Sequence, residues 1–111
     1  MARILVLVLS GPESGGRVAA ALGFAARAHD LGAEVRVVFF ADGVRVALEG
    51  ERYPELARGL AELARRGLTP LVCRRNLEAL GREPVLSGFA VRYIGADLVQ
   101  AAEDGFTVFS F

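Results

Sequence analysis

Two runs of branched apolar residues constrain the fold of this 111-residue chain more than any other feature. They extend from Arg3 to Leu9, RILVLVL, and from Glu34 to Phe40, EVRVVFF. Runs that are mostly apolar, rather than strictly alternating, are typical of strands buried on both faces of a parallel sheet. Between them, Val18 to Leu31 has the apolar spacing of a helix that packs on a sheet, and Gly32 ends it. The chain therefore begins with a strand, a crossover helix and a second strand.

The same alternation of strand and helix continues to the end of the chain. The remaining predicted elements are a helical turn within residues 43–50, a helix from Pro54 to Arg66, a strand from Thr69 to Val72, a helix from Arg74 to Leu80, a linker over residues 82–88 that contains Pro84, a strand from Ala90 to Ile94, a helix from Ala96 to Glu103 and a strand from Phe106 to Phe111. This pattern predicts a single α/β domain over residues 1–111, with a largely parallel sheet and right-handed crossovers.

The only cysteine, Cys73, lies where the strand ending at Val72 meets the helix that begins at Arg74. In parallel α/β folds this place is the carboxyl edge of the sheet, where small ligands bind. The helix dipole and the cations of Arg74 and Arg75 favour the thiolate form of a thiol placed there. The alternative is structural, because a free cysteine is often buried and then behaves as a small hydrophobe. Position alone leaves both interpretations open.

Composition excludes several classes of site. With one cysteine and one histidine, the chain has no internal disulfide and no ordinary three- or four-ligand Cys/His zinc site, and this usage fits a reducing cytoplasm. Thirteen basic and thirteen acidic residues balance, so no general attraction to nucleic acid or to an anionic membrane is encoded. All the basic residues are arginine, which excludes a lysine Schiff base. No stretch approaches the ~18 apolar residues of a membrane span.

The loop over residues 11–18, GPESGGRV, has the glycine spacing of a P-loop but lacks its decisive residues. Arg17 stands at the lysine position, and Val18 replaces the Ser or Thr that would hold magnesium. Nucleotide hydrolysis is therefore disfavoured, and a plain turn is the better interpretation. Weak anion binding on the backbone amides of Gly15 and Gly16 remains an alternative, since the loop opens a helix.

Asp42 and Gly43 follow the second apolar run, at a second carboxyl-edge turn. The Asp42 carboxylate is a candidate pocket residue because functional groups collect at strand ends. An Asp-Gly pair also favours a tight bend, so turn chemistry explains the same residues equally well.

Hydrophobic residues make up 53% of the chain, and the mean hydropathy is +0.40. This is more apolar surface than one small core easily buries. A self-association face is the simplest explanation, so we expect a homo-oligomer.

Several stretches follow one another along the chain: LGFAARAHDLG, EVRVVFF running into ADGV, a strand ending in Cys73, VRYIG and the final GFTVFSF. Taken together, they resemble the DsrE/DsrF-like family of small sulfur-relay proteins. The resemblance covers almost the whole chain, with FFADGV at residues 39–44 and Cys73 as its most specific parts. It implies a three-layer α/β/α domain with a five-stranded, mainly parallel sheet, assembled into homotrimers or hexamers. It also implies that a cysteine carries sulfur as a persulfide, and Cys73 is the residue here that matches.

Two functions follow as hypotheses. In the first, Cys73 is the persulfide site of a sulfurtransferase-type carrier, Arg74 and Arg75 stabilise the anion, donor and acceptor proteins are the partners, and no metal or organic cofactor is needed. In the second, the chain is a non-enzymatic, homo-oligomeric binding module whose carboxyl-edge pocket holds a small ligand or a partner peptide. The loops Ser10 to Gly16, Asp42 to Val44 and Cys73 would form this pocket, with Gly15, Gly16, Asp42 and Gly43 as its candidate residues.

Overall fold

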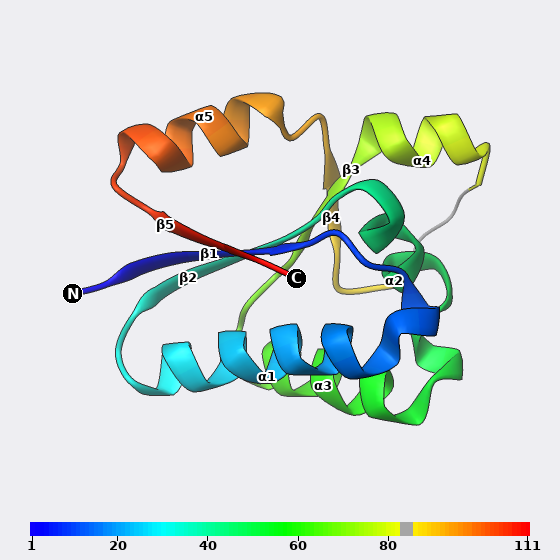
Figure 1. Cartoon of the computed structure of the whole chain (residues 1–111), viewed down its shortest axis with the longest axis horizontal. Helices are drawn as coiled ribbons and strands as arrows, with labels where there is room; N and C mark the ends of the chain where they lie inside the picture. Colours follow the sequence, from blue (N-terminus) through cyan, green and yellow to red (C-terminus); the bar gives the residue numbers. More distant parts are fainter. Residues whose placement is uncertain (83–85) are drawn as a thin grey trace.

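The computed structural model describes residues 1–82 and 86–111 of the chain. Strands and helices alternate along it (Figure 1). In chain order the elements are β1 (Arg3–Val8), η1 (Pro12–Ser14), α1 (Gly15–Asp30), β2 (Glu34–Phe39), η2 (Ala41–Gly43), α2 (Val44–Glu49), η3 (Gly50–Arg52), α3 (Pro54–Arg65), β3 (Leu71–Cys73), α4 (Arg74–Leu80), β4 (Ala90–Arg92), α5 (Gly95–Glu103) and β5 (Thr107–Ser110), where η marks a short 3-10 helix.

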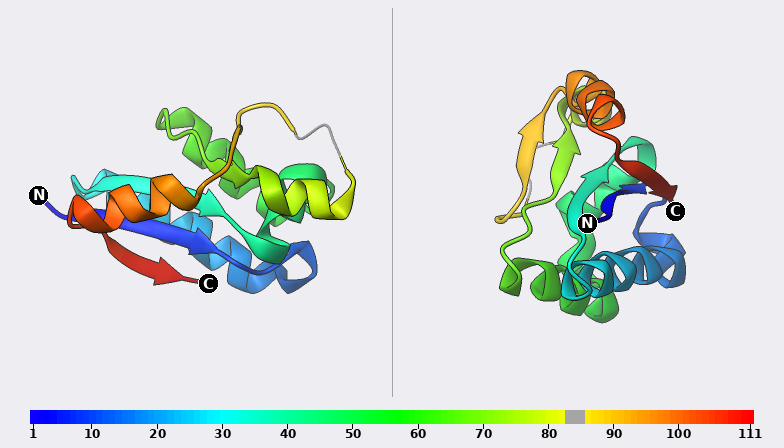
Figure 2. Two further views of the ribbon diagram at one scale, coloured as in Figure 1. Left: turned by 90° about the horizontal axis from the view of Figure 1, so that it is seen from above. Right: turned by 90° about the vertical axis from the view of Figure 1, so that its left-hand side faces the viewer.

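The five described strands form one sheet in the order β4-β3-β2-β1-β5, and every neighbouring pair is parallel. Helices α1 and α3 cover one face of the sheet, while α4 and α5 lie on the other (Figure 1). The end-on view in Figure 2 shows the sheet between these two helix layers. The predicted three-layer α/β/α architecture with a five-stranded parallel sheet is therefore confirmed. All the carboxyl ends of the strands meet at one edge, which is where the candidate site lies.

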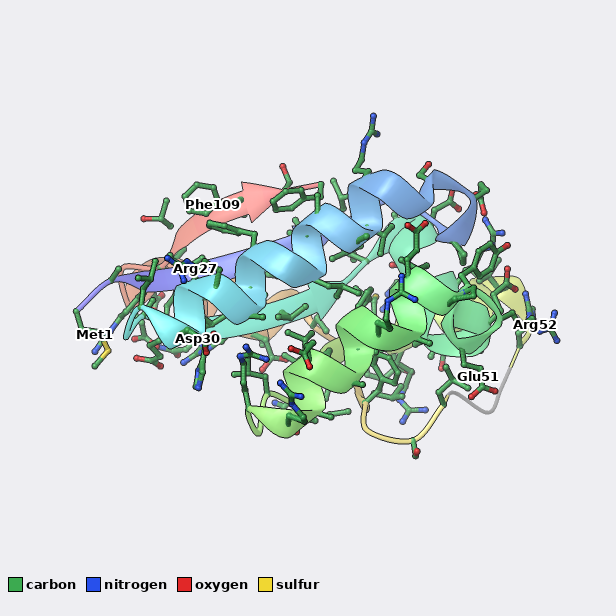
Figure 3. The ribbon with its side chains drawn as sticks, turned by 90° about the horizontal axis from the view of Figure 1, so that it is seen from below. Met1, Arg27, Asp30, Glu51, Arg52 and Phe109 are labelled. Carbon is green, nitrogen blue, oxygen red and sulfur yellow. The ribbon has the colours of Figure 1, made fainter. Side chains whose placement is uncertain are left out.

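The core forms where α1 and α3 pack on the sheet. Val18, Leu22 and Ala25 share one face of α1 and are fully buried, as their spacing predicted. Each buried leucine of this kind stabilises the fold by about 1.5–3 kcal/mol through the apolar surface that it removes from water. The two helices lie side by side in Figure 3, and they approach closely because Gly59 presents no side chain to Leu22.

Aromatic residues extend the core to the β5 edge of the sheet. The ring of Phe24 on α1 lies 5.0 Å from that of Phe109 on β5 and 6.1 Å from that of Phe111. Figure 3 labels Phe109 beside α1. Because β5 has only one neighbouring strand, β1, this aromatic cluster secures an edge strand that would otherwise depend on its hydrogen bonds to β1 alone.

Several element boundaries differ from those predicted. Helix α1 begins at Gly15 instead of Val18, because the turn of η1 continues directly into it and overrides the poor helix preference of two glycines. Residues 41–52 form α2 with a 3-10 turn at each end, which is more helix than the single turn expected. Strand β4 stops at Arg92, two residues early, since the backbone of Ile94 is already helical. In the predicted linker, Pro84 lies outside the described residues.

Candidate functional site

The carboxyl edge of the sheet brings the ends of β3 and β4 together. Cys73 is the last residue of β3 and pairs in register with Arg92, the last residue of β4. The backbone of Cys73 is extended, with φ −68° and ψ 112°, and the next residue begins α4. Strand β3 is only three residues long, and it ends because the chain turns here into a helix closed by Gly81 at φ 64°. The predicted position of Cys73 between strand and helix is confirmed.

Cys73 is buried but not sealed. Its exposed fraction is 4%, yet it lines a pocket of about 410 Å³. The buried or half-buried lining residues are Phe40, Cys73, Ile94 and Leu98, and the exposed ones are Arg75, Tyr93, Gly95 and Ala96. Cys73 is therefore one of the buried residues that line a largely apolar pocket, and the exposed lining residues form its rim. We call this space the Cys73 pocket.

Arg75 and Tyr93 lie on the exposed rim of the Cys73 pocket. The guanidinium carbons of Arg74 and Arg75 lie 5.9 and 5.8 Å from the centre of the Tyr93 ring, within the range of cation–π attraction. Within the described part of the chain, Arg75 forms no ion pair, so its charge is available to an anion in the pocket that it lines. Arg74 does not line the Cys73 pocket but a neighbouring one. Of the two arginines, Arg75 is the better placed to stabilise a charged sulfur.

Tyr93 is tied to α4 through its hydroxyl group. That group donates a hydrogen bond of 2.7 Å to Oε2 of Glu78. The bond raises the pKa of Tyr93 above its ordinary value, assisted by burial and by the negative charge of Glu78. The tyrosine therefore stays protonated, and able to donate, throughout the neutral pH range.

The Asp42-Gly43 turn lies at the same edge but faces a different pocket. Asp42 lines a space of about 350 Å³ with Leu9, Ala41, Asn76 and other residues of α4, while neither Asp42 nor Gly43 lines the Cys73 pocket. Gly43 has a packing role, because a β-carbon there would lie 1.9 Å from the carbonyl oxygen of Val8. Only glycine lets the turn approach the end of β1 this closely.

The glycine-rich loop before α1 also lies apart from Cys73. Gly15 and Gly16 form the first turn of α1, and neither lines the Cys73 pocket. A β-carbon at Gly15 would lie 2.5 Å from a carboxylate oxygen of Glu55, so an acidic group already sits beside this helix start. Glu13 in the same loop pairs with Arg45 through two hydrogen bonds of 2.8 Å. Carboxylates of Glu13 in the loop and of Glu55 on α3 thus already lie near this helix start, which disfavours an anion there.

Within residues 1–82 and 86–111, no group of three or more His, Cys, Asp or Glu side chains is suited to hold a metal ion. In the same ranges, no helix has both the length and the apolar character needed to cross a bilayer.

The sequence matches the DsrE/DsrF-like family over residues 2–111. The chain belongs to this family. The predicted resemblance to this family is thus confirmed, and the match covers nearly the entire chain. No curated protein matches it.

Three solved structures share the fold of this DsrE-like chain. The ychN protein from E. coli has a TM-score of 0.83 at 18% identity, and the protein of unknown function MTH1491 from Methanobacterium thermoautotrophicum has a TM-score of 0.77 at 21% identity; both alignments cover 100% of each chain. The conserved protein of unknown function BT1422 from Bacteroides thetaiotaomicron has a TM-score of 0.66 at 19% identity, covering 98% of this chain and 94% of the other. At these identities the likeness shows the fold alone.

Sequence reasoning missed three residues around the site. Tyr93 and Glu78 form the rim contact, and Asn76 ties α4 to the loop after β2. A signal existed for Glu78, which lies one helical turn beyond Arg74 and so on the same face of α4. None existed for its pairing with Tyr93, since that bond joins separate elements.

Proposed function

We propose that this DsrE-like protein is a sulfur carrier of the sulfurtransferase type, with Cys73 as its persulfide site, acting in a reducing cytoplasm. The Cys73 thiolate attacks the terminal sulfur of a donor persulfide, R–S–SH. A new S–S bond forms on Cys73, the S–S bond of the donor breaks, and the donor leaves as the thiolate R–S⁻. In the second half, an acceptor thiolate attacks the terminal sulfur held on Cys73 and regenerates the Cys73 thiolate. Electrons and atoms balance in each half without an external oxidant.

The observation that carries this proposal is that the nearly buried residue Cys73 lines a pocket. A persulfide needs access for one donor at a time and shelter from the thiols around it. The 4% exposure of Cys73 provides the shelter, and the pocket of about 410 Å³ provides room for one more sulfur atom and the end of a donor. The positive charge of Arg75 on the rim stabilises the thiolate anions that form in both halves of the reaction.

Loading by a cysteine desulfurase tests the proposal. The protein is incubated with the desulfurase and cysteine, and its intact mass is measured. We expect wild type to gain one sulfur atom and Cys73→Ser to gain none. Addition of excess small thiol should return the mass of the loaded protein to its starting value. Because the chain has a single cysteine, the intact mass also locates the added sulfur.

We also propose that the chain acts as a homo-oligomer, a trimer or a hexamer. The supporting observation is the exposure of Val108 and Phe109 on the edge strand β5 and of Val99 on α5. Exposed apolar side chains on an edge strand favour contact with another chain. Light scattering at micromolar concentration should give three or six times the mass of one chain, and a monomer would contradict this proposal without affecting the role of Cys73.

The second pocket favours a second candidate function, a binding module without catalysis. The Asp42 pocket, of about 350 Å³, opens at the same sheet edge and does not include Cys73. A small ligand bound there would raise the melting temperature of wild type and of Cys73→Ser equally. Loss of that stabilisation in Asp42→Asn, together with failure of Cys73 to load sulfur, would favour this function over the carrier.

A further inference from the structure

Tyr93 follows directly after β4 and lines the same pocket as Cys73. Cys73 pairs with Arg92, the last residue of β4, so Tyr93 is the first residue after the end of the neighbouring strand. Both residues line the Cys73 pocket, but they lie at opposite depths. Cys73 is 4% exposed and Tyr93 is 54% exposed, so the tyrosine stands on the solvent side of the pocket and the sulfur on the protein side.

Contacts from α4 hold the Tyr93 ring in that position. The hydroxyl group donates to Glu78, and the guanidinium groups of Arg74 and Arg75 lie near the ring. All three partners belong to α4, whereas Tyr93 lies in the turn between β4 and α5. The ring therefore connects the two segments that border the pocket. Since both Tyr93 and Glu78 are exposed, water competes for their hydrogen bond and the ring can be released at modest cost.

We propose that Tyr93, held by Glu78, is the residue that sets which sulfur compounds reach Cys73. With the bond to Glu78 in place, the slender terminus of a persulfide enters beside the ring. A donor with a ring or a broad side chain next to its sulfur reaches Cys73 only when the bond breaks and the tyrosine moves aside. This inference rests on the proposed role of Cys73 and adds the size of the substrate that it accepts.

Reaction of the unloaded thiol with two neutral disulfide-type reagents tests this inference. The small reagent is methyl methanethiosulfonate and the broad one is 2,2′-dithiodipyridine. In each reaction the Cys73 thiolate attacks a sulfur of the reagent, a mixed disulfide forms, and methanesulfinate or the pyridine thiolate leaves. The rates are measured for wild type, Tyr93→Phe, Glu78→Gln and the double variant. Tyr53→Phe is the matched control, because Tyr53 does not line the pocket.

We expect Tyr93→Phe to react about fivefold faster with the broad reagent, which is the factor that one hydrogen bond of average strength represents. Its rate with the small reagent should change less than about twofold. Glu78→Gln should shift the rates in the same direction, because a neutral amide accepts more weakly than a carboxylate. The double variant should match Tyr93→Phe, since both substitutions act on one bond. Tyr53→Phe should behave as wild type.

Two results would overturn the inference. One is an unchanged rate with the broad reagent in both Tyr93→Phe and a further variant, Tyr93→Ala. The other is an equal acceleration with both reagents, which would indicate general loosening instead of selection by size. The sulfur-loading experiment is independent of this one. Size selection without sulfur loading would contradict the carrier proposal but support the role of Tyr93. Sulfur loading without size selection would support the carrier proposal and contradict the role of Tyr93.

Discussion

The side-chain oxygen Oδ1 of Asn76 accepts a hydrogen bond of 2.9 Å from the backbone N–H of Ala41. This bond joins α4, the helix that follows Cys73, to the loop that follows β2. Ala41 lies in the left-handed region, at φ 54°, and within the described residues it is the only residue other than glycine with a positive φ. The orientation of α4, and with it the positions of Arg75 and Glu78, is therefore linked to a strained residue on a neighbouring loop.

Removing the Asn76 side chain should weaken the fold slightly. We expect Asn76→Ala to lower the free energy of unfolding by ~0.5–1 kcal/mol, because the lost hydrogen bond exceeds the gain in helix preference. Urea denaturation measures the change. Asn76→Asp keeps an acceptor oxygen and should retain most of the stability; equal losses in both variants would contradict a role for this bond.

Relieving the strain at Ala41 should have the opposite effect. We expect Ala41→Gly to raise the free energy of unfolding by ~0.5–1 kcal/mol. Glycine removes the steric cost that alanine has in the left-handed conformation of the folded state, and this gain exceeds the loss caused by the greater backbone entropy of glycine in the unfolded state. Ala61→Gly, on the exposed face of α3, is the matched control and should lose ~1 kcal/mol. A loss at both positions would show that Ala41 is not strained.

Glycine is required at position 43 by the nearby backbone. A β-carbon there would lie 1.9 Å from the carbonyl oxygen of Val8, so Gly43→Ala must displace either the turn or the end of β1. We expect a loss of ~3 kcal/mol or more in thermal or urea unfolding, at the upper end of the cost of overpacking. Gly16→Ala, in the first turn of α1 with no atom within 4 Å of the added carbon, should be neutral or slightly stabilising. Similar effects at both positions would contradict the close approach.

Acid should weaken the pairing of α1 with the end of α3. Asp30 accepts two hydrogen bonds of 2.8 Å from Arg66, and these bonds lower the pKa of Asp30 below its ordinary value of 3.8. A lowered pKa means that the pair stabilises the folded state above about pH 3.8 and that this contribution is lost as the pH falls through the lower, folded-state pKa. Figure 3 labels Asp30 at the end of α1.

Asp30→Asn should therefore flatten the pH dependence of unfolding below about pH 4, with little change in slope near neutrality. Glu103→Gln is the matched control, because Glu103 forms no ion pair with a described residue. An acid slope in Asp30→Asn equal to that of wild type would contradict this assignment.

Local sequence patterns predicted much of the fold but only part of the candidate site. Helix α4 was predicted with its observed bounds because Gly81, in the left-handed conformation, is a strong local stop signal. The position of Cys73 at the carboxyl edge followed from strand and helix order. Its burial did not, because the strand and helix pattern does not show that Ile94 and Leu98, which follow β4 in the chain, line the same pocket as Cys73.

The contact between Tyr93 and Glu78 could not be predicted from the sequence. The pattern of residues 90–94 predicted a strand, and an alternating strand would have buried Tyr93 or exposed it without a partner. In the structure the strand ends at Arg92, and Tyr93, which follows it, donates a hydrogen bond to Glu78 on α4. No periodicity in the sequence encodes a contact between separate elements of this kind.

The intact mass of the protein after incubation with cysteine desulfurase and cysteine shows whether Cys73 carries transferable sulfur. We expect a gain of one sulfur atom in wild type, no gain in Cys73→Ser, and complete loss of the added mass when an acceptor thiol is supplied. An unchanged mass in wild type, under conditions that load a known persulfide carrier, would contradict it.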